Sequence, residues 1–128
     1  LPPAVTAMTG IDAMVHAIEA YTSKLKKNPL ADSLAREALR IMYDHLPRVL
    51  ANGQDIESRS AMLAGSMMAG MAFANAPVAA VHALAYPLGG HFHVPHGLSN
   101  ALVLAPVLEY NLPAAEALYA ETGCGMIL

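Results

Sequence analysis

Asp12 and His16 stand four residues apart in an apolar segment, a spacing that puts both side chains on one face of a helix. His82 and His96 follow fourteen residues apart, on either side of Pro87-Leu88-Gly89-Gly90. If the segments that carry them are neighbours in space, one carboxylate and three imidazoles can meet at one point. Three nitrogen donors and one oxygen donor suit a borderline divalent cation such as Fe²⁺ or Zn²⁺.

Each of these residues also has a simpler interpretation. An Asp and a His one turn apart often form only a contact on the helix surface, and a buried histidine is usually a hydrogen-bonded core residue. The apolar setting favours the metal site, because an unpaired carboxylate at Asp12 would be costly to bury. His82 likewise lies among apolar residues with no acidic partner nearby in the sequence. The spacing alone leaves both interpretations open.

The segment from Ser60 to Leu108 contains no Asp, Glu, Lys or Arg, yet it holds four of the six histidines of the chain. Its length would allow a membrane span. It is interrupted, however, by polar and helix-breaking residues, and no belt of aromatic residues flanks it. We therefore expect the central helices of a soluble bundle and no membrane span. The interrupting residues are Gly65, Ser66, Gly70, Asn75, Pro77 and His82.

The composition limits the class of protein. At 128 residues the chain is one domain at most, and 55% of its residues are hydrophobic while 13% are charged. The net charge of −3 gives no basic surface for a nucleic acid. A single cysteine, Cys124, excludes an intrachain disulfide and fits a reducing compartment, so we expect a cytoplasmic protein. The start, Leu1-Pro2-Pro3, lacks the pattern of a signal peptide, and we expect the chain to be part of a longer polypeptide.

Hydrophobic periodicity and capping residues predict an all-α bundle of about five to six helices. The first helix covers residues 9–22, capped by Thr9 or Gly10. A second begins at Asn28-Pro29, is interrupted by Pro47 and ends at residues 51–53. A third, capped by Asp55, covers residues 56–74, and its many small residues predict a central position in the bundle.

The second half of the chain predicts shorter helices. One starts at Ala76-Pro77 and runs to about Tyr86, where the Pro-Gly-Gly break leads into an irregular segment over residues 91–95. The next begins near His96 and is closed by Leu112-Pro113, and a last short helix covers residues 114–121.

Two segments resemble the signatures of the iron-containing (group III) alcohol dehydrogenases, and the similarity extends from Leu1 to about Glu121. The first segment is Gly10-Ile11-Asp12-Ala13-Met14-Val15-His16-Ala17-Ile18-Glu19-Ala20-Tyr21. The second runs from His82 through Ala83-Leu84-Ala85-Tyr86-Pro87-Leu88-Gly89-Gly90 to Pro95-His96-Gly97-Leu98-Ser99-Asn100-Ala101. The resemblance implies that Asp12, His16, His82 and His96 are the metal ligands of a helical C-terminal domain. It also implies Fe²⁺, or Zn²⁺ in some members, and a small alcohol or aldehyde substrate oxidised or reduced with NAD(P).

The chain departs from this family pattern at two places. Many relatives carry a further histidine four residues after the third ligand, where this chain has Tyr86. The N-terminal α/β domain with its glycine-rich loop is absent, so NAD(P) is expected only with that domain. We expect residues 1–121 to form a helical metal-binding domain that is part of an enzyme, and residues 122–128 to form an atypical tail. The helical domain is expected to dock on such an N-terminal α/β domain, and a homo-oligomer is compatible with it.

Proton transfer would fall to residues beside the four ligands. Tyr86 and His91 are the candidate catalytic residues, with His93 as a second relay to solvent. For the two histidines, a position in a surface loop without a catalytic role is the simpler interpretation. Phe73 and Phe92 could line a substrate pocket or belong to the core. Two rival hypotheses remain, a non-catalytic divalent-metal-binding helical domain and a plain helical interaction module.

Overall fold

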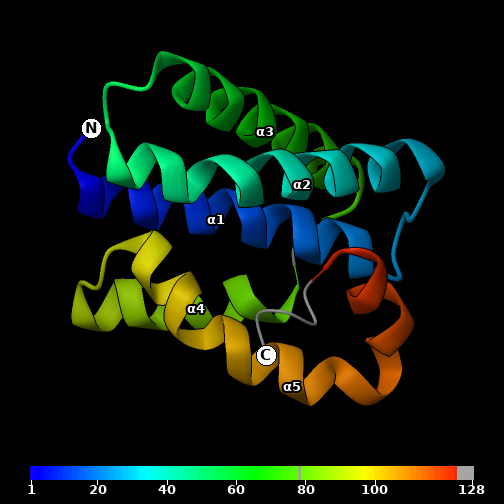
Figure 1. Ribbon diagram of the computed structural model, residues 1–128. Helices are drawn as coiled ribbons and strands as arrows, with labels where there is room; N and C mark the ends of the chain where they lie inside the picture. The colour runs from blue at the N-terminus through cyan, green and yellow to red at the C-terminus, as the bar shows by residue number, and fades with distance from the viewer. Residues whose placement is uncertain (78, 124–128) are drawn as a thin grey trace.

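In the computed structural model, which describes residues 1–77 and 79–123, helix α1 (Pro3–Thr22) lies between two layers of helices (Figure 1). Helices α2 (Pro29–Ala51) and α3 (Ile56–Asn75) pack on one side of it. Helices α4 (Ala80–Phe92) and α5 (His96–Glu121) pack against each other and form the second layer, where α5 contacts α1. The described residues contain five helices and no strand, which confirms the prediction of an all-α bundle.

The central place of α1 explains why apolar residues surround its whole circumference. Val15, Ala17 and Ile18 are completely buried, although they point to different sides of the helix. A helix that is hydrophobic all round is buried all round. The few polar side chains of this helix must therefore find partners inside the protein.

The starts of α2 and α3 confirm the caps predicted from the sequence. The side chain of Asn28 accepts a hydrogen bond from the backbone N–H of Ala31 at 2.9 Å, with Pro29 as the first helical residue. The carboxylate of Asp55 accepts hydrogen bonds from the backbone N–H of Ser58 at 3.1 Å and from its hydroxyl at 2.7 Å. Local sequence signals decide both helix starts.

The predicted start of the first helix was wrong by six residues. Helix α1 begins at Pro3, whose fixed φ suits a first helical position. The Thr9 hydroxyl bonds back to the carbonyl of Val5 at 2.9 Å and caps nothing. Gly10 is buried where the side chain of Leu46 crosses α1, so its small size serves packing and not helix termination.

Pro47, Pro87 and Pro113 do not interrupt or end helices as the sequence predicted, whereas Pro106 lies inside a helix as expected. Helix α2 continues through Pro47, α4 continues through Pro87, and α5 absorbs both Pro106 and Pro113. The predicted fifth and sixth helices are therefore one helix, which curves toward its end (Figure 1). All four prolines are exposed, so water can reach the backbone carbonyl that each proline leaves without its helical partner.

Helix α4 also differs from its predicted bounds. Ala76, predicted to start this helix, is instead the C-cap of α3. Helix α4 begins at Ala80 and runs through Gly89 and Gly90 to Phe92. His93 then adopts a left-handed conformation with φ of 56°, and its N–H bonds to the carbonyl of Gly89 at 3.1 Å. The predicted irregular segment shrinks to the three residues between α4 and α5.

The prediction that the small-residue helix is central was wrong. Helix α3 is the outermost helix of its layer in Figure 1, and Leu63, Met67 and Met71 are exposed on its outer face. Three of its small residues, Gly65, Ala69 and Ala72, lie on the inner face and let it approach α1 and α2 closely, whereas Ser66 and Gly70 are exposed. Small residues here indicate close contact on one side only.

Two glycines of α3 predict opposite effects of substitution by alanine. A Cβ at Gly65 would lie 2.6 Å from Cγ of Met42, a buried side chain. A Cβ at Gly70 meets nothing within 4 Å. We expect Gly65→Ala to lower the free energy of unfolding by about 1–3 kcal/mol through overpacking. Gly70→Ala should raise it by about 0.5–1 kcal/mol through helix propensity. Chemical denaturation of the two variants side by side measures the difference.

Among the described residues, no single helix is long and apolar enough to cross a membrane. Only α3 and α4 taken together, with a bend of 106° between them, reach that length and hydropathy.

Candidate metal centre

The first two candidate ligands come from one face of α1. The Nδ1 atom of His16 lies 2.9 Å from the backbone carbonyl oxygen of Asp12. Because a carbonyl can only accept, Nδ1 carries the proton and Nε2 keeps its lone pair. The four-residue spacing thus orients the imidazole as well as placing it beside the carboxylate. Both side chains are half-buried.

Helix α4 contributes His82, whose side chain is only 2% exposed. Its Nδ1 atom lies 2.7 Å from Oε2 of Glu19, and its Nε2 atom lies 3.6 Å from Oδ1 of Asp12. The rings of His82 and His16 are neighbours, with centroids 4.4 Å apart. A buried histidine on α4 therefore faces the Asp12 and His16 pair of α1.

Helix α5 contributes His96 as its first residue. Its Nε2 atom lies 3.5 Å from Oδ1 of Asp12, and its side chain is 45% exposed. Three helices thus bring together all four side chains that the sequence singled out. His96 stands at the open side of the cluster and His82 at its closed side.

Asn100, one turn after His96, is completely buried next to these four residues. Its side-chain nitrogen donates a hydrogen bond to Oδ1 of Asp12 and lies 3.3 Å from Nε2 of His82 and 3.2 Å from Nε2 of His96. Three candidate ligand atoms therefore converge on one positively polarised group. The side-chain oxygen of Asn100 has no hydrogen-bond partner in the described part of the chain.

The donor set fits a divalent cation. Asp12, His16 and His82 each offer a ligand atom, and these atoms all lie within 4.8 Å of one another. Together with His96 they supply imidazole and carboxylate donors and no thiolate, which suits Fe²⁺ or Zn²⁺ in a reactive site better than in a purely structural one.

The charges around the cluster also favour a cation. Burial alone would lower the pKa of His82, but the nearby carboxylate of Asp12 and the hydrogen bond to Glu19 raise that pKa to about 9. Burial would raise the pKa of Asp12, yet the neighbouring imidazoles of His82 and His16 and the hydrogen bond from Asn100 lower it. For His16, burial is the largest cause and lowers the pKa. Two carboxylates thus stabilise positive charge at this point, whether a proton or a metal ion carries it.

Tyr86 borders the open side of the cluster. Its ring stacks on that of His96 with centroids 5.8 Å apart, and it meets the ring of His82 edge-on at 6.4 Å. The side chain is 61% exposed, so the phenol is accessible from solvent. The structure therefore places this candidate catalytic residue beside two of the candidate ligands.

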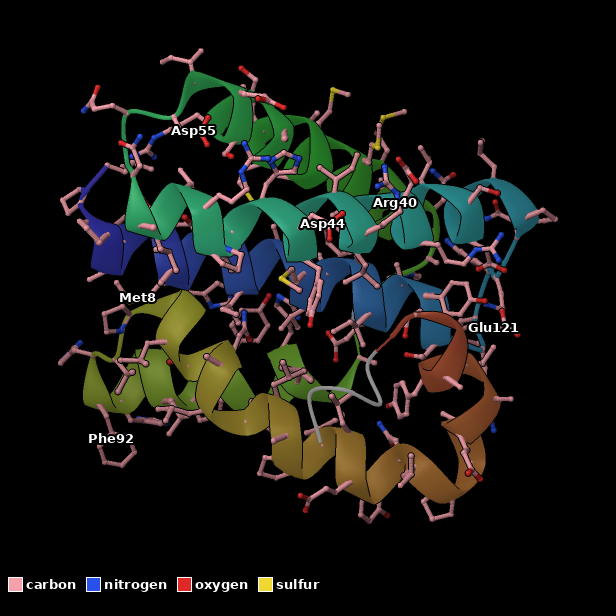
Figure 2. All side chains as sticks on the ribbon, in the orientation of Figure 1. Met8, Arg40, Asp44, Asp55, Phe92 and Glu121 are labelled. Atoms are coloured by element: carbon pink, nitrogen blue, oxygen red, sulfur yellow. The ribbon has the colours of Figure 1, made fainter. Side chains whose placement is uncertain are left out.

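The other candidate residues are placed less closely. His91 and His93 are exposed, and neither side chain joins the hydrogen-bond network around Asp12 in the described residues. Phe73 touches the ring of His16, with centroids 5.0 Å apart. Phe92 projects outward from the end of α4 in Figure 2 and is exposed. Of these four residues, Phe73 is the one in contact with the cluster.

The chain was compared with known proteins. The family model described as Fe-containing alcohol dehydrogenase family, C-terminal, matches residues 6–128. The chain belongs to this family. The matched residues include both segments that contain the candidate ligands, and the predicted family is confirmed.

Named relatives support the assignment. The chain is 54% identical over 110 residues to long-chain-alcohol dehydrogenase 1 of Geobacillus thermodenitrificans, covering 86% of this chain and 28% of the relative. It is 44% identical to 1,3-propanediol dehydrogenase of Klebsiella pneumoniae, covering 94% of this chain and 31% of the relative. The solved alcohol dehydrogenase from Oenococcus oeni superposes with a TM-score of 0.92 at 42% identity, covering 94% of this chain and 31% of that one. This member of the iron-containing family thus spans less than a third of the length of these relatives.

Sequence reasoning missed two residues of the cluster, Glu19 and Asn100. The argument applied to Asp12, that a carboxylate in an apolar helix needs a partner, holds equally for Glu19, which lies between Ile18 and Ala20. Asn100 shares a helix face with His96 four residues earlier. The tail predicted to be atypical falls mostly on residues 124–128, which lie outside the described residues.

Proposed function

We propose that this chain is the metal-binding part of an NAD(P)-dependent alcohol dehydrogenase, an oxidoreductase that interconverts small alcohols and their aldehydes or ketones. Asp12, His16, His82 and His96 are the proposed ligands. The observation that supports this most is the convergence of Asp12, His82 and His96 on one point, beside His16. When bound there, Fe²⁺ or Zn²⁺ supplies Lewis acidity toward the oxygen of an alcohol or carbonyl group.

Exposure separates the residues that shield the site from water from those that face the substrate. The buried side, with His82 and Asn100, excludes water from the back of the site. Substrate reaches the open side, past His96 and Tyr86. We propose that the phenol of Tyr86 holds the substrate oxygen through a hydrogen bond, and that His91 passes the alcohol proton to solvent.

NAD(P) binding is assigned to an N-terminal α/β domain that docks on this helical domain, consistent with relatives about three times as long. We place the protein in the cytoplasm and consider a homo-oligomer compatible with it. The proposal rests on family membership for the reaction and on the cluster for the metal.

The experiment is an assay of NAD(P)⁺-dependent oxidation of primary alcohols by a longer polypeptide, in which an N-terminal α/β domain precedes these 128 residues. Chelation should abolish the activity, and Fe²⁺ or Zn²⁺ should restore it. His16→Ala should leave less than about one hundredth of the rate, since a ligand is lost, while His45→Gln on α2 should leave the rate unchanged. Activity that survives both the chelator and His16→Ala would refute the proposal.

The non-catalytic alternative is separated by the same longer polypeptide with its N-terminal domain, because the 128 residues alone lack a nucleotide-binding domain under either hypothesis. A metal-binding domain without hydride transfer predicts bound metal and no alcohol oxidation. The plain interaction module predicts neither bound metal nor any effect of a chelator.

Tyr86→Phe tests the proposed role of the phenol. The variant keeps the ring that stacks on His96 and removes only the hydroxyl. We expect kcat/KM to fall about tenfold or more while the metal content stays the same, because the hydroxyl contributes a hydrogen bond or a proton to the substrate oxygen. Steady-state kinetics with elemental analysis checks this. An unchanged kcat/KM would remove Tyr86 from the mechanism.

A further inference from the structure

Glu19 is a second acidic residue on the inner helix α1, only 4% exposed. Both of its carboxylate oxygens accept hydrogen bonds from α4. Oε1 accepts from the backbone N–H of Val81 at 2.7 Å, and Oε2 accepts from Nδ1 of His82 at 2.7 Å. A buried carboxylate with both oxygens paired in this way is held in one position.

The bond to Val81 has a structural purpose. Val81 is the second residue of α4, and Ala79, which precedes the helix, offers no side chain to cap it. One oxygen of Glu19 therefore satisfies a free N–H at this helix start, as a local Asn or Asp does elsewhere. This contact needs only an acceptor and would be served equally well by an uncharged amide oxygen.

The bond to His82 has a different consequence. A carboxylate accepts only, so Nδ1 of His82 carries a proton, and the atom left to donate a lone pair is Nε2, which faces Asp12 at 3.6 Å. His16 has the same arrangement, with a backbone carbonyl in place of the carboxylate. In both imidazoles Nε2 is thus the nitrogen that keeps its lone pair.

We propose that Glu19 is a positioning residue of the metal site: it fixes the tautomer and ring orientation of His82 and thereby sets the affinity of the site for a divalent cation. The inference rests on the proposed metal function. It adds to that function a residue that contacts the ligand His82 and is not itself a metal ligand. Outer carboxylates bound to metal-ligating histidines typically change metal affinity 10- to 100-fold.

Glu19→Gln separates the two oxygens. The glutamine keeps the shape and retains a carbonyl for the N–H of Val81, but it presents an N–H₂ group to Nδ1 of His82. That nitrogen must then accept, so the proton moves to Nε2 and no lone pair faces the metal. The matched control is Glu109→Gln, an exposed site on α5 that loses the same charge.

The measurement is Zn²⁺ affinity of the 128-residue chain by competition with a chelating dye, with the helical content of the metal-free chains recorded by circular dichroism. Glu19→Gln should bind Zn²⁺ about 10- to 100-fold more weakly than wild type at unchanged helical content. Glu109→Gln should bind as wild type does. Wild-type affinity in Glu19→Gln would overturn the role of Glu19 and leave the metal site standing, whereas no Zn²⁺ binding by wild type would contradict the proposed function itself.

A second readout covers the case in which Glu19→Gln does not fold. In the Zn²⁺-loaded wild-type chain, ¹⁵N NMR should show a protonated Nδ1 and a metal-bound Nε2 for His82. Metal bound through Nδ1 would overturn the inference. A purely structural role for Glu19 would change thermal stability but neither the affinity nor this spectrum.

Discussion

Gly97→Ala is expected to destabilise the domain by about 3 kcal/mol and to disrupt the metal site with it. A Cβ at this position would clash with the backbone carbonyl oxygen of Met8 and would lie 2.6 Å from its carbonyl carbon. No rotation of a side chain relieves a clash with backbone, so the start of α5 must move away from α1. Met8 lies where α1 passes that start in Figure 2.

The movement matters because His96 immediately precedes Gly97. A site that requires its ligands within about 0.5 Å loses affinity when one of them is shifted by more than that. We therefore expect Zn²⁺ affinity to fall at least tenfold in Gly97→Ala. Gly90→Ala, at a position with open space, should lower neither the free energy of unfolding nor the Zn²⁺ affinity. Thermal melts and zinc titrations of the two variants check the pair, and a stable Gly97→Ala that binds zinc normally would show that the close approach is not required.

His82→Ala is expected to have the second large effect. The substitution leaves Oε2 of Glu19 without its partner at a position only 4% exposed. Removing one member of a buried pair costs about 3–5 kcal/mol, because the other charge stays buried and uncompensated. The free energy of unfolding of the metal-free chain, from urea denaturation, should fall by this amount.

A double variant distinguishes the lost charge pair from the lost volume of the ring. Glu19→Gln combined with His82→Ala removes the charge that His82→Ala leaves unpaired. We expect the double variant to be more stable than His82→Ala alone. Its loss of unfolding free energy should be smaller than the sum of the losses in the two single variants by at least about 1 kcal/mol, which is the coupling energy of the pair. Strictly additive effects would mean that the two side chains do not stabilise each other.

The sequence predicted those parts of the fold that depend on neighbours in the chain. Asn28 and Asp55 could be predicted as caps, because a cap depends only on nearby residues: each side chain accepts a hydrogen bond from an N–H three residues later. Asp12 and His16 were paired for a similar reason, since helical spacing alone brings them to one face. Periodicity also predicted the helical class and the approximate place of the helices.

Contacts between distant segments decided the rest. Pro47 was predicted to interrupt its helix, but Leu46 and Val49 bury one face of α2 on both sides of this proline, and packing overrides the missing hydrogen bond. The bond between Glu19 and His82 joins residues 63 positions apart, and although the apolar setting of Glu19 indicates that it needs a partner, nothing local identifies that partner as His82. The prediction that the four candidate ligands meet depended on the helices being neighbours, which only the fold establishes.

The most direct test of the account is the amount of metal bound by the purified 128-residue chain, measured by elemental analysis after equilibration with Zn²⁺ and removal of excess ion. We expect one zinc per chain for wild type. His16→Ala and Asp12→Asn should bind less than about one tenth of that amount, while His45→Gln should still bind one zinc per chain. A wild-type chain without zinc, or one zinc retained in both ligand variants, would contradict the metal centre on which the proposed function rests.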